Sequence, residues 1–96
     1  MATLRIEHPI TDYDTWRRAF DSFAAARDRA GVQHHRILRP VDDQQHVTID
    51  LDFATVPAAE QFLTFLQTSV WSDPGRSPAL AGVPQTRILV LAQDDS

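Results

Sequence analysis

The start of the chain carries the strongest constraint on its fold, because its hydrophobic period changes there from two to about 3.6. Residues 3–8 alternate apolar and polar side chains, as a half-buried strand does. Pro9 interrupts the alternation, and apolar side chains then recur at intervals of three and four, as on one face of a helix. The sequence therefore predicts a strand over residues 3–8 that leads into a helix over residues 13–30, which Gly31 ends.

The rest of the chain continues this pattern of strands and helices. Its predicted elements are strands at 33–40, 46–53 and 86–92, a helix at 57–70, a single helical turn at 77–82 and a frayed tail at 93–96. The order strand–helix–strand–strand–helix–strand is that of the ferredoxin-like α+β fold. It predicts an antiparallel sheet with both helices on one face and the spatial strand order fourth, first, third, second. The 96 residues form a single domain, 1–96, by their length.

The register of the predicted hairpin follows from matching its faces. If Ile37 lies opposite Ile49, then Arg36 lies opposite Asp50, so apolar and charged residues each find a suitable neighbour. A slip of one residue would place Ile37 opposite Asp50 and bring each side chain to the wrong face. The first pairing is therefore expected, with His35 on the helix-facing side.

The other face of the predicted sheet is polar, and its charged residues can pair across strands. These residues are Arg5, Glu7, Arg36 and Asp50. They form either a solvated surface or a contact with the same face of a second subunit. The last strand differs, because its apolar run over 88–92 predicts burial on both faces.

Composition excludes several classes of function. A net charge of −4 and a pI near 5.3 argue against nucleic-acid binding, and the absence of cysteine excludes thiolate metal sites. No apolar run approaches the ~18 residues of a membrane span, and no signal peptide is recognisable, which predicts a cytoplasmic protein. Nothing in the spacing of the histidines and carboxylates indicates a metal site, and no motif indicates a cofactor.

Several short motifs together resemble small bacterial proteins of the dimeric α/β-barrel superfamily. The motifs are His8-x3-Asp12-Tyr13-Asp14-x-Trp16-x3-Phe20-Asp21, Arg27…Ala30-Gly31-Val32, Asp42-Asp43 and Ala81-Gly82-Val83-x-Gln85. Relatives in that superfamily include antibiotic biosynthesis monooxygenases, polyketide cyclases and haem-degrading monooxygenases. The resemblance implies a homodimer whose two sheets close into a barrel, with the polar faces inside it. It also implies a pocket between the helices and the sheet of each subunit.

His8 is the candidate catalytic residue, because it ends the first strand on the pocket side and imidazole titrates near neutral pH. Its alternative role is a hydrogen bond to the start of the following helix. The candidate pocket residues are Tyr13, Trp16, His35 and Trp71. For Trp16 the favoured alternative is a core position, and for His35 it is a partly exposed position on an edge strand. The two histidines are expected to be about 9–10 Å apart laterally, which is too far for direct contact.

The chain also departs from the superfamily's pattern. Cofactor-free monooxygenases and haem-degrading members use an asparagine in the site, and this sequence contains none. Haem-degrading members also carry a histidine ligand on the second helix, which residues 60–70 lack. The leading hypothesis is thus a cofactor-independent monooxygenase- or cyclase-like enzyme for a small aromatic or polyketide-like molecule. The alternative is a non-catalytic dimeric module that binds a small ligand or a protein. An RNA-binding ferredoxin-like domain is disfavoured, because the polar face presents no aromatic residues.

Overall fold

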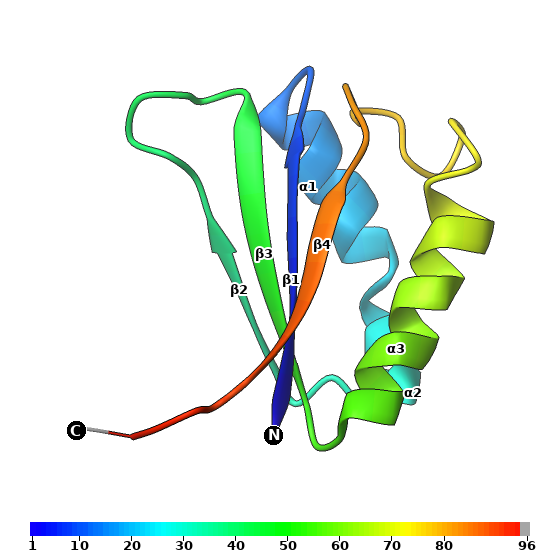
Figure 1. Cartoon of the computed structure of the whole chain (residues 1–96). Helices are drawn as coiled ribbons and strands as arrows, with labels where there is room; N and C mark the ends of the chain where they lie inside the picture. The colour runs from blue at the N-terminus through cyan, green and yellow to red at the C-terminus, as the bar shows by residue number, and fades with distance from the viewer. Residues whose placement is uncertain (95–96) are drawn as a thin grey trace.

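The sheet has the predicted topology. A computed structural model describes residues 1–94, so the last two residues of the predicted tail lie outside the described part. Four antiparallel strands are arranged in the order β2-β3-β1-β4 (Figure 1). Their bounds are β1 Ala2–Pro9, β2 His34–Leu38, β3 His46–Phe53 and β4 Gln85–Val90.

The helices all cover one face of this sheet, which confirms the ferredoxin-like α+β fold (Figure 1). Their bounds are α1 Tyr13–Ser22, α2 Ala24–Ala30, α3 Val56–Phe65 and the π-helix η1 Leu66–Val70. Side-chain caps begin the two longer helices: the Asp12 carboxylate accepts a hydrogen bond from the Thr15 amide, and the Thr55 side chain accepts one from the Ala58 amide. Gly31 ends α2 with a φ of 89°, a conformation that glycine adopts without strain.

The prediction of one continuous helix over residues 13–30 was wrong, because the helix breaks at Phe23. The carbonyl of Phe20 accepts two hydrogen bonds there, from the Phe23 amide at 3.2 Å and from Nη1 of Arg27 at 2.6 Å. A tight turn and a guanidinium group thus satisfy this carbonyl together. The break leaves Arg27 facing inward, with only 7% of its surface exposed.

The second predicted helix changes its winding before it ends. Its last turn is a π-helix, in which the amide of Trp71 donates to the carbonyl of Leu66, five residues earlier, at 2.8 Å. Such turns are rare and occur frequently at functional sites. The wider turn buries Leu66 and Val70 and brings Trp71 to the inner side of the structure.

The core lies between the helices and the inner face of the sheet. The predicted hairpin register is confirmed, since Ile37 pairs with Ile49 and Arg36 with Asp50. Alternate residues of β1 and β3 supply most of the buried apolar surface, and the aromatic rings of α1 and α3 close over them. The strand residues of this core are Ala2, Leu4, Ile6, Val47, Ile49, Leu51 and Phe53.

Two expectations near the end of the chain were wrong. The last strand is not buried on both faces: Val90 is 63% exposed and Leu91 is 74% exposed. β4 is an edge strand, so it has a neighbouring strand on one side only. The helical turn expected at 77–82 is shorter than predicted: it is a single hydrogen-bonded turn from Ser77 to Leu80. Leu80 then forms a β-bridge with Ile10 instead of continuing the turn.

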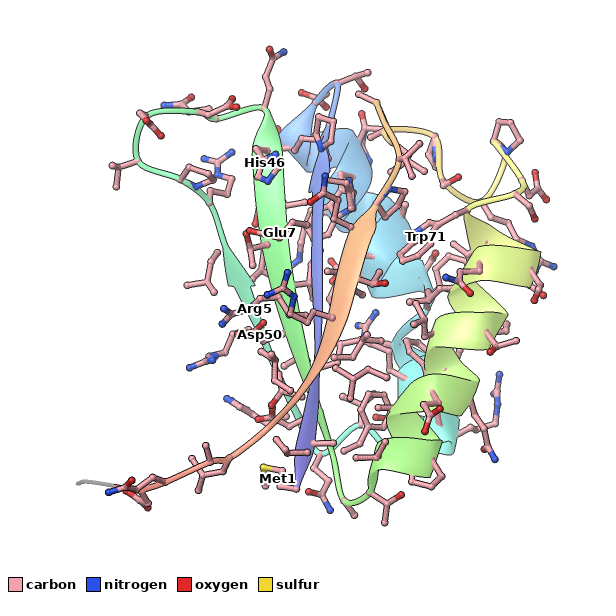
Figure 2. The ribbon with its side chains drawn as sticks, in the orientation of Figure 1. Met1, Arg5, Glu7, His46, Asp50 and Trp71 are labelled. Carbon is pink, nitrogen blue, oxygen red and sulfur yellow. The ribbon has the colours of Figure 1, made fainter. Side chains whose placement is uncertain are left out.

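The outer face of the sheet carries the expected ion pairs. Asp50 accepts hydrogen bonds from Nε and Nη2 of Arg5 and from Nη2 of Arg36, all at 2.9 Å (Figure 2). The two arginines cover this carboxylate so completely that it is only 1% exposed. Their hydrogen bonds and charges hold the pKa of Asp50 below its ordinary value. Glu7 instead accepts a hydrogen bond from Thr48.

Candidate functional site

The candidate site is a cavity of about 80 Å³ between the sheet and the helices. Its walls are almost entirely apolar, and they come from β1, β3, all the helices and the loop that follows η1. The lining side chains are Ile6, His8, Trp16, Ala19, Phe20, Phe23, Arg27, Ile49, Leu51, Phe62, Leu66, Val70, Trp71, Arg76, Ser77, Pro78, Ala79 and Leu80. Three of the five residues proposed from the sequence are among them: His8, Trp16 and Trp71.

His8 reaches this cavity because of the two-residue period of β1. Leu4 and Ile6 point toward the helices, so His8 does too, and it is only 3% exposed. Its Nδ1 lies 2.9 Å from the carbonyl oxygen of Pro9. A carbonyl oxygen can only accept, so Nδ1 carries the proton and Nε2 is the nitrogen with a free lone pair when the ring is neutral. The expected alternative role, a bond to the start of α1, is therefore not the one that fixes the ring.

The Nε2 atom of His8 is open to the cavity. Within residues 1–94 it has no hydrogen-bond partner. Every side-chain nitrogen or oxygen that is fully enclosed in that part of the chain does have a partner, so Nε2 is not fully enclosed. Nε2 therefore keeps access to open space, and the cavity is the space that His8 lines. Burial lowers the pKa of His8 below its ordinary value of 6.5, and the nearby His46 lowers it further, against the opposing bond to Pro9. The ring is consequently neutral at pH 7.

A row of aromatic rings runs from His8 along α1. Trp16 lies 6.3 Å from His8 between ring centroids, Phe20 lies 5.2 Å from Trp16, and His35 lies 5.4 Å from Phe20. Tyr13 lies beside Trp16, with the ring centroids 5.8 Å apart and the ring planes tilted by 37°. The rings of Tyr13 and His35 are thus behind the cavity wall rather than part of it.

His35 is farther from His8 than the lateral spacing suggested. His8 pairs with Val47 and His35 with Leu51, four residues apart along β3. Four residues of strand span about 13 Å along the strands, at right angles to the lateral separation of about 10 Å, so the two positions are about 16 Å apart. His35 is also exposed, so a ligand held at His8 does not extend to it within the cavity.

The loop after η1 closes the other end of the cavity. Trp71 lies at the end of that helix (Figure 2). Two backbone hydrogen bonds tie the loop to the end of β1, from the Thr11 amide to the Ala79 carbonyl at 3.0 Å and from the Ala81 amide to the Pro9 carbonyl at 3.2 Å. The segment that follows His8 therefore also fixes the position of the loop.

Arg27 is the site residue that sequence reasoning missed. Its guanidinium lies 3.8 Å from the centroid of the Phe20 ring and lines the cavity. The sequence did contain an indication of this position, since Arg27 continues the inward-facing stripe of Trp16, Phe20 and Phe23.

Within residues 1–94, no three histidine or acidic side chains converge in a way that could hold a metal ion. None of the helices described is long and apolar enough to cross a membrane.

Comparison with known proteins supports the fold. No protein-family model matches the sequence, and no curated protein matches it significantly. SnoaB, a cofactor-independent oxygenase from Streptomyces nogalater, has a similar structure, with a TM-score of 0.68 at 16% identity over 98% of this chain and 95% of that one. A candidate antibiotic biosynthesis monooxygenase from Nitrosomonas europaea gives a TM-score of 0.66 at 15% identity over 95% of this chain and 89% of that one.

A third similar structure is a dimeric ferredoxin-like protein from an uncultured marine organism. It gives a TM-score of 0.63 at 9% identity over 98% of this chain and 97% of that one. At these identities the similarity is one of fold. The superfamily resemblance found in the sequence is confirmed at that level: the chain has the fold of SnoaB-like oxygenases and of dimeric ferredoxin-like proteins.

Proposed function

We propose that this protein is a cofactor-independent enzyme, monooxygenase- or cyclase-like, that acts on a small aromatic or polyketide-like molecule. The observation that carries the proposal is the placement of His8, which lines an apolar cavity and whose Nδ1 is bonded to the Pro9 carbonyl, so that Nε2 is left for a ligand. The fold shared with a cofactor-independent oxygenase supports it. Trp16, Phe20 and Trp71 supply flat apolar walls suited to an aromatic ring.

The proposed role of His8 is that of a general base. A neutral imidazole accepts a proton at Nε2 while Nδ1 donates to the Pro9 carbonyl, which holds the ring in place. Removing an acidic proton from an aromatic or polyketide-like substrate generates an electron-rich carbon. That carbon can add to dioxygen to give a hydroperoxide, which loses water and leaves a carbonyl group, as in a monooxygenation. It can instead attack a carbonyl carbon of the same molecule, as in a cyclisation. Apolar walls exclude water from the anion.

Turnover by a His8→Gln variant tests this role. Wild type, His8→Gln and the control His34→Gln would be assayed against a panel of aromatic and polyketide-like substrates. His34 is exposed at the start of β2, does not line the cavity and is not among the groups that shift the pKa of His8, so its substitution removes a histidine without touching the site. We expect His8→Gln to lower kcat by about 10²–10⁴-fold and His34→Gln to retain activity. Equal activity of wild type and His8→Gln would exclude the assigned role.

The alternative function is a non-catalytic module that binds a small ligand, and the size of the cavity favours it. At about 80 Å³ the cavity is roughly half the ~150 Å³ that admits benzene in an apolar core. Trp71 or the adjoining loop must therefore move before a ring can enter. Ligand binding that is unaffected by His8→Gln, without turnover of any substrate tested, would favour this alternative.

We also propose that the protein is a homodimer in the cytoplasm, each subunit a single domain, and that it acts without nucleic acid or a membrane partner. The support for the dimer is the dimeric ferredoxin-like proteins of the same fold. Residues 1–94 also present a broad polar sheet face that no helix covers (Figure 1). The acidic pI of about 5.3 supports the absence of a nucleic-acid partner.

A further inference from the structure

We propose that the cavity selects a ligand that carries an anionic oxygen, a carboxylate or an ionised enol, and that Arg27 binds this group. The inference deepens the proposed function, since it names the class of ligand that the same cavity takes. It starts from Arg27, a residue with only 7% of its surface exposed that lines an apolar cavity. Burial of a charge is unfavourable unless the charge is paired.

Arg27 has no such pair within the described residues. Nη1 donates to the Phe20 carbonyl, and the ring of Phe20 lies against the guanidinium plane. Neither partner carries a charge, and no carboxylate lies within ion-pairing distance in residues 1–94. By contrast, the arginines Arg5 and Arg36 on the outer face share the carboxylate of Asp50.

The remaining guanidinium donors of Arg27 are open to a ligand. A guanidinium has five N–H groups in a planar fork that matches a carboxylate, and Nη1 to Phe20 is the single hydrogen bond it makes in the described chain. In the described chain, every fully enclosed side-chain nitrogen has a hydrogen-bond partner. The unbonded nitrogens therefore keep some access, and the cavity is the space that this side chain lines.

The ionisable side chains that line the cavity favour an anion. They are His8, Arg27 and Arg76, and none of the lining residues of the described chain is acidic. Arg76 stands at the exposed loop, where it donates to the Ser69 carbonyl and lies 3.9 Å from Asp73. Asp73 offsets part of that charge, and Asp21 and Asp28 offset part of the charge of Arg27 from beyond ion-pairing distance. His8 remains neutral, so it does not compete for the anion.

The arrangement also fits the proposed chemistry. An arginine placed to hold a carboxylate fixes the ligand's orientation in the cavity, and the same cation stabilises an enolate that forms when His8 removes a proton. The chain has no asparagine to supply a neutral donor for that oxygen. Arg27 is a buried, positively charged donor that the cavity offers in its place.

Binding of matched acid and amide probes tests the inference. The probes are benzoate with benzamide and propionate with propionamide, measured by calorimetry at pH 7. Each pair has nearly the same shape and differs in charge, and the smaller pair suits the cavity even if the aromatic rings stay packed. We expect wild type to bind a carboxylate at least about tenfold more tightly than its amide, because a charged hydrogen bond is stronger than a neutral one.

Three variants separate recognition from folding. Arg27→Met should reduce the preference for carboxylate to about one, and Arg27→Lys should retain part of it, because lysine keeps the charge but not the fork. Arg29→Met is the matched control: it removes an exposed arginine of the same helix α2 and should leave the preference unchanged. Thermal melting of each variant checks that it is folded.

The outcomes are distinguishable from those that test His8. If no carboxylate binds wild type, if acid and amide bind equally, or if folded Arg27→Met keeps the preference, the inference is wrong. Suppose that the preference for carboxylate depends on Arg27 but that wild type and His8→Gln turn over substrate equally. This result would support anion recognition by Arg27 and reject the role of His8 as general base. His8→Gln itself should keep the preference for carboxylate.

Discussion

At the scale of single residues, two buried charged side chains have opposite surroundings. Asp50 on the outer face is enclosed by two arginines that neutralise it, whereas Arg27 on the inner face is enclosed without a counter-charge. Asp50 therefore has its charge neutralised within one chain, whereas Arg27 keeps N–H donors that have no acceptor in the described chain. Unused capacity at a cavity is what distinguishes a binding residue from a structural one.

The lowered pKa of His8 makes a prediction about stability. The folded state keeps this histidine neutral below its ordinary pKa of 6.5, whereas the unfolded chain takes up a proton there. The free energy of unfolding should therefore decrease as the pH falls below about 6.5, by at most about 1.4 kcal/mol per pH unit for each such histidine. The decrease should stop once the pH passes below the folded pKa.

Chemical denaturation of wild type and His8→Gln from about pH 5 to about pH 8 measures this dependence. The variant should show a shallower loss of stability on acidification. The pKa of exposed His35 is also lowered, chiefly by desolvation, so part of the dependence should remain. The lowered pKa of Asp50 acts below its ordinary value of 3.8 and does not contribute in this range. Parallel curves for wild type and variant would show that His8 is not buried neutral.

At the scale of secondary-structure elements, the site depends on two features that interrupt regular structure. The break at Phe23 turns Arg27 inward, and the π-helix brings Trp71 to the cavity. The loop that follows is held against the end of β1. Gly82 contributes to this contact, because a Cβ atom at that position would lie 2.8 Å from Cγ of Pro9.

Substitution of Gly82 should therefore loosen the cavity's outer wall. In Gly82→Ala the new methyl group must displace Pro9 or the loop, and we expect a loss of about 1–3 kcal/mol of stability. Val83→Ala is the matched control, because Val83 is 86% exposed in the same loop. Thermal unfolding of both variants provides the measurement. A Gly82→Ala protein as stable as wild type would mean that the loop is not held at this contact.

The elements themselves were largely predictable, because each follows from a local pattern. Alternation in β1 fixed the direction of His8, and face matching between Ile37 and Ile49 fixed the hairpin register. The break and the π-helix were not predictable in this way. The break coincides with a hydrogen bond from Arg27 to the carbonyl of Phe20, seven residues earlier, which helical periodicity does not specify, and no local pattern marks the π-helix.

The site was predictable in part for the same reason. Strand alternation and helical spacing indicate which side chains face inward, so His8, Trp16 and Trp71 were placed in one region. Neither pattern determines how far along a face a ring lies, and His35 therefore seemed nearer to His8 than it is. Arg27 was overlooked because a charged residue on an apolar stripe can also end at the surface.

At the scale of the whole molecule, the uncovered sheet face is the surface on which the proposed dimer depends. Arginine–carboxylate contacts occupy its centre, and Leu38 is 46% exposed on the same face of β2. The exposed Val90 and Leu91 lie at the end of the edge strand β4. A second copy that packs on this face would cover apolar side chains that one subunit leaves in water.

The mass in solution tests this assembly. Light scattering at micromolar concentration should give about twice the 10.8 kDa of one chain. Leu38→Arg should give a single chain, because it adds a charge to the proposed interface. Val41→Arg makes the same kind of change in the hairpin loop, where the side chain is fully exposed, and should remain dimeric. A wild-type protein that stays at the mass of one chain would rule out the barrel.

The central claim is that His8 removes a proton from a ligand held in the cavity, and the pH dependence of turnover tests it most directly. For a substrate that wild type converts, kcat/KM should increase with pH and level off above the lowered pKa of His8, at or below its ordinary value of 6.5. His8→Gln should lose both the activity and this limb of the profile. Turnover by His8→Gln at the wild-type rate, with the same pH profile, would contradict the account.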